Sequence, residues 1–135
     1  MLNAPIPTTS VTDEVLAQVF VDGGVTPRLV MEGTVFLPGP GVLALQRNAD
    51  TNRLAFECGL TFGFRTDLVT KKRFLNHLVT KESGFRAHVN DDGRLICSHD
   101  LVLARHLLPT RVLHSYRYFR AAMERVLAAG EGILS

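Results

Sequence analysis

The first regular pattern lies near the N-terminus, where apolar side chains recur at threes and fours. Acidic residues in the first turn favour a helix start near Thr12, and the pair Gly23-Gly24 ends it. The pattern predicts an amphipathic helix that buries one face. Its apolar positions are Val15, Leu16, Val19 and Phe20.

From Leu29 to Phe64 the apolar period changes from about 3.6 to about 2, which is typical of strands covered on one face. Three strands fit, over residues 29–37, 42–48 and 54–64, with a Pro-Gly-Pro turn and a turn at Asp50 and Thr51 between them. In the third strand the even positions are bulky and the odd ones small or polar. At roughly 36 Å this strand is long, so we expect Gly59 or Gly63 to bend it.

Antiparallel partners across a turn have a constant sum of residue numbers, so each turn predicts a register. Both registers place the bulky residues of the three strands on one face, which should cover the core. For the first strand these residues are Leu29, Met31, Val35 and Leu37. The turn at residues 50 and 51 pairs Leu45 with Phe56 and Leu43 with Cys58. The Pro-Gly-Pro turn pairs Val35 with Leu43 and Gly33 with Leu45.

The second half predicts a helix, a hairpin and a last helix. Thr66 is a candidate cap for a helix that runs to about Val79, and Pro109 opens a helix that continues to Gly130. Residues 99–108 are expected to be irregular or a short turn. Between the helices, the Asp91-Asp92-Gly93 loop suits a hairpin that pairs Val89 with Leu95 and Ala87 with Cys97. The last helix has its apolar positions at Val112, Tyr116, Phe119, Met123, Val126 and Leu127.

The helix that ends near Val79 carries more apolar surface than one contact needs. Leu68, Leu75 and Val79 fall along one line, which we expect to face the core. Phe74 and Leu78 form a shoulder beside that line. The shoulder is therefore a candidate surface for a partner.

The order helix, three strands, helix, two strands, helix predicts an α+β fold. We expect a two-layer sandwich, α-β-β-β-α-β-β-α, with an antiparallel sheet and the helices packed on one of its faces. The 135 residues have the size of one domain. Residues 1–11 are expected to be a loose arm and residues 130–135 a frayed tail.

Composition narrows the class of protein. An apolar fraction of 46% with 21% charged residues is typical of a globular chain. The apolar runs are too short to cross a bilayer and the first residues lack an export signal, so we expect a cytoplasmic protein without membrane contact. A net charge of +2, with a pI near 8.8, permits a polyanionic partner without requiring one.

The cysteines and histidines show no spacing typical of a metal site. Cys58 and Cys97 lie far apart without a CxxC pattern, which favours two reduced, buried thiols over a disulfide or metal ligands. His99, His106 and His114 lack the helical i, i+4 spacing of zinc ligands. We therefore expect no metal and no cofactor.

Catalytic motifs are also missing from the sequence. Ser98 and His99 are neighbours, but adjacent strand residues point to opposite faces, which argues against a catalytic dyad. No nucleophile elbow, P-loop or dinucleotide fingerprint occurs, and Asp91-Asp92-Gly93 lacks the other ligands of a calcium loop. The sequence predicts a protein that is not an enzyme.

The segment RFLNHLVTKESGFRAHVNDDGRLICSHDLVL resembles the YbjN-like bacterial domain. In that family a helix ending in a Leu-Asn pair leads to a short Asp-Gly hairpin and a final amphipathic helix, and here Leu75-Asn76, Phe85, Asp92-Gly93 and the helix from Thr110 take those places. The likeness extends from Thr12 to Ala129. It implies the type III secretion chaperone fold, whose members commonly form homodimers and bind proteins, and a link with sensory and stress regulation. Secretion chaperones tend to be acidic, whereas this chain is mildly basic.

These observations predict a homodimeric module that binds an unidentified protein. The candidate interface combines the shoulder of the helix with the small-residue face of the third strand: Phe74, Leu78, His77, Ala55, Gly59 and Gly63. The small-residue face of the third strand can equally be exposed to solvent. The alternative is a nucleic-acid-binding regulator that uses a basic cluster formed by Arg65, Lys71, Lys72 and Arg73.

Overall fold

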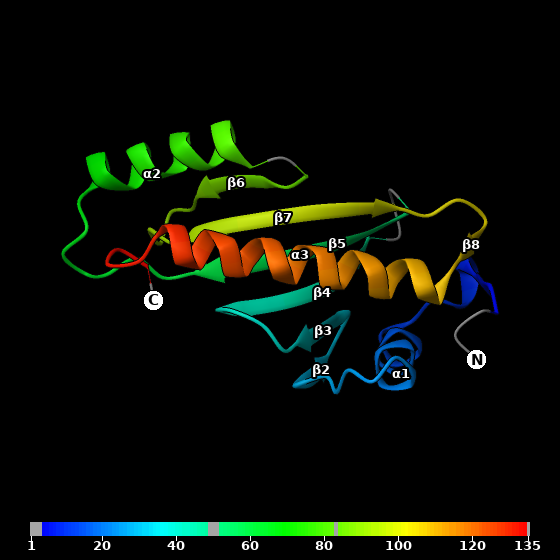
Figure 1. Ribbon diagram of the computed structural model, residues 1–135. Coiled ribbons are helices and arrows are strands. Elements are labelled where there is room, and N and C mark those ends of the chain that lie inside the picture. The colour runs from blue at the N-terminus through cyan, green and yellow to red at the C-terminus, as the bar shows by residue number, and fades with distance from the viewer. Residues whose placement is uncertain (1–3, 49–51, 83, 135) are drawn as a thin grey trace.

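A computed structural model describes residues 4–48, 52–82 and 84–134 and contains one large antiparallel sheet with helices against one face (Figure 1). The strand order in this sheet is β2-β3-β4-β5-β7-β6. Its strands are β2 (Leu29–Met31), β3 (Thr34–Leu37), β4 (Val42–Asn48), β5 (Arg53–Leu60), β6 (Arg86–Val89) and β7 (Leu95–Val102). The helices are α1 (Asp13–Asp22), α2 (Leu68–Lys81) and α3 (Pro109–Ala129). The predicted α+β class and the order of the main elements are confirmed.

The core lies between the sheet and the helices. Phe56 and Leu45, on the inner face, are fully buried, and so is Phe119 of α3. The α3 helix runs along the middle of the sheet, in front of β5 and β7 in Figure 1, and its inward side chains recur at threes and fours. Burying this stripe is what stabilises a helix against a sheet, because an amphipathic helix gains most of its stability from packing.

Two predicted registers are confirmed. β4 pairs with β5 so that Leu45 lies opposite Phe56, although the turn at residues 50 and 51 lies outside the described residues. β6 pairs with β7 so that Val89 lies opposite Leu95, with Gly93 in the left-handed conformation of the turn. In both hairpins the short turn and the apolar alternation specify the same pairing.

The prediction of one strand over residues 29–37 is wrong. Gly33 takes a left-handed backbone, φ +73°, and reverses the chain, so β2 folds back on β3 with Val30 opposite Val35. Because β2 forms the edge of the sheet, Leu29 and Met31 are exposed instead of lining the core. Apolar alternation continued across Gly33, and this concealed the turn.

The Pro-Gly-Pro turn is also displaced from its predicted centre. Val35 pairs with Leu45 and Leu37 with Leu43, because the reversal includes Gly41, which has a left-handed φ of +59°. The register therefore differs from the predicted one by two residues. A slip of two leaves each side chain on its predicted face, so Val35 and Leu37 are buried as expected.

The third predicted strand is shorter than expected. β5 ends at Leu60, and beyond it Phe62 still points into the core while Phe64 is 93% exposed. The helix that follows begins after Asp67, whose carboxylate accepts a hydrogen bond from the Thr70 N–H, so the cap is Asp67 and not Thr66. α1 starts at Asp13, as predicted, and Thr12 caps it by accepting a hydrogen bond from the Val15 N–H.

Described residues near both ends pair with the rest of the fold, whereas residues 1–11 were expected to be a loose arm and residues 130–135 a frayed tail. Ile6 and Pro7 form β1, which pairs with β8 (His106–Leu107) in the segment expected to be irregular, and a 3-10 turn follows at Thr8–Ser10. At the other end Leu134 bridges to Phe62, and the Gly63 N–H donates to the Ile133 carbonyl. Among the described residues, no helix is long and apolar enough to cross a bilayer.

Candidate interaction surfaces

The structure places the predicted shoulder of α2 in the core and exposes both ends of the predicted core line, while Leu75 of that line packs partly against the core. Phe74 and Leu78 are only 7% and 2% exposed and belong to the core. The Phe74 ring packs edge-on against Phe62 at 6.4 Å, beside Gly130 at the end of α3. These two residues are therefore not available to a partner, because the long-range contacts with Phe62 and Gly130 turn this side of α2 inward.

The other side of α2 carries the exposed apolar residues. Leu68 and Val79 are each 59% exposed, and the partly buried Leu75 lies between them on the same face. We call Leu68, Leu75 and Val79 the α2 stripe. Phe64 lies in the loop that leads to it. Exposed apolar side chains on one face of a helix can mark an interface.

His77 is exposed on α2, on the side of the helix away from the α2 stripe. Of the predicted small residues, Ala55 and Gly59 do lie on the outer face of β5, which the helices leave uncovered. Gly63 does not, because it lies beyond the end of β5 and bonds to Ile133. The structure thus spreads the six predicted interface residues over the core, the helix surface, the outer sheet face and the segment that follows β5.

The outer face of the sheet contains a shallow hollow of about 280 Å³. Its floor includes Ala44, Gly59 and Ile96, where small side chains leave room between the strands. Glu57 and Arg94 line it with opposite charges. This mixed lining matches the surface chemistry of a transient contact better than that of a buried dimer seam.

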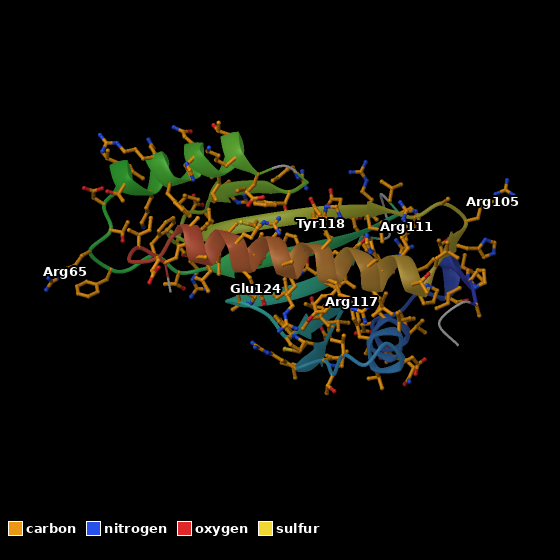
Figure 2. All side chains as sticks on the ribbon, in the orientation of Figure 1. Arg65, Arg105, Arg111, Arg117, Tyr118 and Glu124 are labelled. Carbon is orange, nitrogen blue, oxygen red and sulfur yellow. The ribbon has the colours of Figure 1, made fainter. Side chains whose placement is uncertain are left out.

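The predicted basic cluster is only partly assembled. Lys71 is committed to the fold, because its ammonium donates to the Gly93 carbonyl at 3.1 Å and lies 5.2 Å from the Phe62 ring centre. Lys72 and Arg73 are exposed on α2, and the Arg65 guanidinium lies 5.4 Å from the Phe64 ring centre. Figure 2 shows Arg65 at one end of the molecule and Arg105 at the other, so the basic side chains do not form one continuous patch.

The two thiols lie opposite each other in the core, on β5 and β7, and both are free. Burial raises the pKa of Cys58 and of Cys97 to about 12, and neighbouring negative charge adds to the effect. Thiols with such a pKa stay protonated near neutral pH, and the thiolate is the reactive form. The described residues include no group of three or more His, Cys, Asp or Glu side chains arranged to hold a metal ion.

Ser98 and His99 point to opposite faces of β7, as predicted. On the inner face, the His99 ring lies 6.4 Å from that of Phe56 and 6.3 Å from that of Phe119, and its Nδ1 lies 2.8 Å from the Gly84 carbonyl oxygen. Ser98 lies opposite Glu57, whose register position is on the outer face. The two side chains therefore do not meet.

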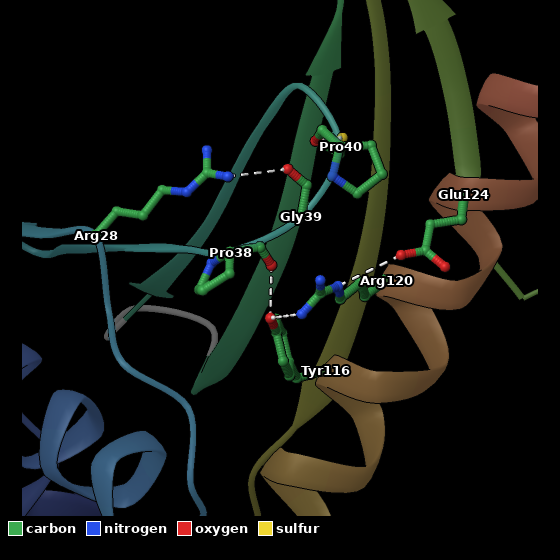
Figure 3. Close-up of polar contacts among 8 residues, drawn as sticks. Arg28, Pro38, Gly39, Pro40, Tyr116, Arg120 and Glu124 are labelled. Atoms are coloured by element: carbon green, nitrogen blue, oxygen red, sulfur yellow. Dashed lines mark hydrogen bonds and ion pairs between the residues drawn. The ribbon is translucent and has the colours of Figure 1, made fainter.

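Side chains from three other elements bind the backbone of the Pro38-Gly39-Pro40 turn (Figure 3). The Tyr116 hydroxyl of α3 donates to the Pro38 carbonyl, and Arg28 donates to the Gly39 carbonyl at 3.4 Å. The Cys58 thiol donates to the Pro40 carbonyl at 3.2 Å. Arg120 donates to the Tyr116 oxygen and pairs with Glu124. The turn is thereby fixed to the helical layer.

Sequence reasoning also missed an apolar cavity of about 500 Å³ at the corner formed by β7, β8 and α3. Most of its lining comes from segments that were expected to be loose or irregular, and only Arg111 and Val112 belong to the predicted last helix, so no periodic pattern indicated the cavity. The exposed Phe64 was missed because the alternation of the preceding strand placed it with the buried residues.

Comparison with known proteins supports the architecture. No family model and no curated protein matches the chain. Among solved structures, it is similar to the crystal structure of YbjN from E. coli, provisionally described as a transcription regulator, with a TM-score of 0.77. The match covers 93% of this chain and 96% of that chain at 13% sequence identity. The chain therefore has a YbjN-like fold.

Proposed function

We propose that the protein is a non-enzymatic protein-binding module that acts as a homodimer. The observation that carries the proposal is the α2 stripe, in which Leu68 and Val79 remain 59% exposed although the core already uses the other apolar side of the helix. A helix on the surface of a monomer needs one apolar side to pack on the core. The exposed apolar residues of α2 are therefore not needed for the fold of a single copy.

A two-fold contact between α2 helices fits this surface. In an antiparallel arrangement Leu68 of one copy meets Val79 of the other, because the contact of a symmetric dimer is self-complementary. At the start of the helix, the hydrogen bond from the Thr70 N–H lowers the pKa of the Asp67 carboxyl, so this cap is negative at neutral pH.

Sedimentation velocity at micromolar concentration tests the dimer. We expect the wild-type protein to sediment as a dimer and the Leu68→Glu/Val79→Glu variant as a monomer, because two buried carboxylates without partners cannot be tolerated at a seam. The control is Val21→Glu/Val102→Glu, which changes two similarly exposed apolar residues elsewhere. A wild-type monomer, or equal effects of both variants, would contradict the proposal.

A nucleic-acid-binding regulator is the second candidate function, because Phe64 and Arg65 pair an exposed aromatic ring with a guanidinium. Such pairs can stack on bases while basic side chains contact phosphates. The YbjN structure is itself described as that of a transcription regulator. Binding to DNA should weaken steeply between low and physiological salt, and the Arg65→Gln/Lys72→Gln/Arg73→Gln variant should reduce that salt slope. No binding at low salt removes this candidate.

A further inference from the structure

The cavity at the corner of β7, β8 and α3 combines an apolar floor with a cationic rim. Leu101, Leu103, Leu107 and Val112 line it, and each is buried or nearly so. Its volume of about 500 Å³ lies in the range of small-molecule sites, which are mostly apolar with a few polar groups. It lies at the end of the sheet away from the loop that carries Phe64 and Arg65 (Figures 1 and 2).

The charged side chains that line the cavity, Arg105 and Arg111, are both cationic. His106 also lines it, and none of its described lining residues is acidic. Within the described part of the chain, these three side chains make no hydrogen bond or ion pair. By contrast, Arg53 and Arg86 both pair with Asp100, and Arg125 pairs with Glu82. Unpaired guanidinium groups beside an apolar floor favour a ligand with an anionic head.

The cavity wall is held in place before any ligand binds. Asn52, with a left-handed φ of +52°, donates from its amide to the Leu103 and Ala104 carbonyls at 2.7 and 2.9 Å. Arg47 in turn donates to the Asn52 side-chain oxygen at 3.0 Å. On the other side, the Thr8 N–H donates to the Arg105 carbonyl. A site whose walls are fixed in advance loses little entropy when it binds.

We propose that this cavity binds a medium-chain fatty carboxylate, with the alkyl chain on the leucine and valine floor and the carboxylate at Arg105 and Arg111. The forked guanidinium groups match the two oxygens of a carboxylate. A bare phosphate would leave the apolar floor unfilled, and a neutral alkane would leave the two arginines without a counter-charge. This site is separate from the α2 stripe, so a test of ligand binding here does not depend on whether the protein is a dimer.

Calorimetric titration with hexanoate, octanoate and decanoate tests the alkyl part of the proposal. Each added methylene should tighten Kd by about fourfold until the cavity is filled. Methyl resonances of Leu101, Leu103, Leu107 and Val112 should shift together on binding. No decanoate binding at millimolar concentration, or shifts confined to other residues, would overturn the proposal.

The charged part is tested with variants. Arg105→Gln/Arg111→Gln should weaken decanoate binding by about tenfold or more but leave decanol binding unchanged, because only the carboxylate pairs with the arginines. The matched control, Lys72→Gln/Arg73→Gln, removes the same charge from α2 and should have no effect. Ala104→Phe adds a ring to an exposed position on the wall and should block both ligands. An equal loss of decanoate affinity in the Arg105→Gln/Arg111→Gln and Lys72→Gln/Arg73→Gln variants would contradict the proposed site.

Discussion

Cys58 and Cys97 illustrate how burial changes the chemistry of single residues. The sequence indicated two reduced, buried thiols, and this prediction is confirmed. It did not indicate that they face each other across β5 and β7, because that pairing depends on a register between strands distant in the chain. Opposite each other in the core, both thiols fill space as small apolar groups.

The raised thiol pKa predicts a loss of stability at alkaline pH. Each pKa is about 12 in the folded protein, against 9.0 as the ordinary value. Above pH 9 the unfolded chain releases these protons while the folded chain keeps them, so the free energy of unfolding falls as pH rises from about 9 to about 12. The two thiols together contribute a slope of up to about 2.7 kcal/mol per pH unit.

Urea unfolding at pH 8, 9 and 10 measures this slope. Removing one thiol with Cys97→Ala should flatten the slope by about half, which separates the contribution of the thiols from that of the rest of the chain. A slope that the substitution leaves unchanged would show that the thiols do not cause it. Labelling by a disulfide reagent at pH 8 should be slow in the native protein and fast in urea.

At the scale of elements, the sequence predicted best where local signals agree. The β4–β5 and β6–β7 registers followed from short turns and apolar alternation. The sides of α2 were assigned wrongly because both are apolar, and the choice depends on where Phe62 and Gly130 lie, which no local pattern encodes. The part of the candidate interface that was placed on Phe74 and Leu78 lies in the core for the same reason.

Gly41 decides the geometry of the β3–β4 connection. A Cβ at this position would clash with the carbonyl oxygen of Gly59, and the left-handed φ disfavours any other residue. We expect Gly41→Ala to lower the free energy of unfolding by about 2–4 kcal/mol. Gly33→Ala is the matched control, because Gly33 is also left-handed but has open space around it. Gly33→Ala should lower the free energy of unfolding by only about 1 kcal/mol. Equal decreases for the two variants in thermal or urea unfolding would show that the clash at Gly41 is absent.

At the scale of the whole molecule, the structure differs from the sequence prediction mainly in how the ends are joined to the rest. β1 and the C-terminal bridge each involve only a few residues, too few to produce a periodic pattern. The cavity beside β8 escaped prediction for the same reason. Contacts between the Pro38-Gly39-Pro40 turn and α3 were equally hidden, since their partners are far apart in the chain.

Tyr116 links the last helix to this turn. Tyr116→Phe keeps the ring but removes the hydrogen bond to the Pro38 carbonyl, so it should lower the free energy of unfolding by about 1–2 kcal/mol. Arg120→Gln should cost less, because the arginine side chain is 42% exposed and its hydrogen bond to Tyr116 is only partly buried. Equilibrium urea unfolding of both variants and the double variant checks this. A cost near zero for Tyr116→Phe would contradict the role of the hydroxyl.

The ties at the two ends of α3 have a mechanical consequence. β8 precedes the first turn of this helix and is paired with β1, while the bridge from Leu134 to Phe62 secures the residues that follow its last turn. Sliding or rolling of the helix over the sheet would have to break one of these anchors. A partner would therefore bind to a surface whose helix is held in place at both ends. The association rate constant should then depend on collision geometry and charge, and not on a slow rearrangement of the helical layer.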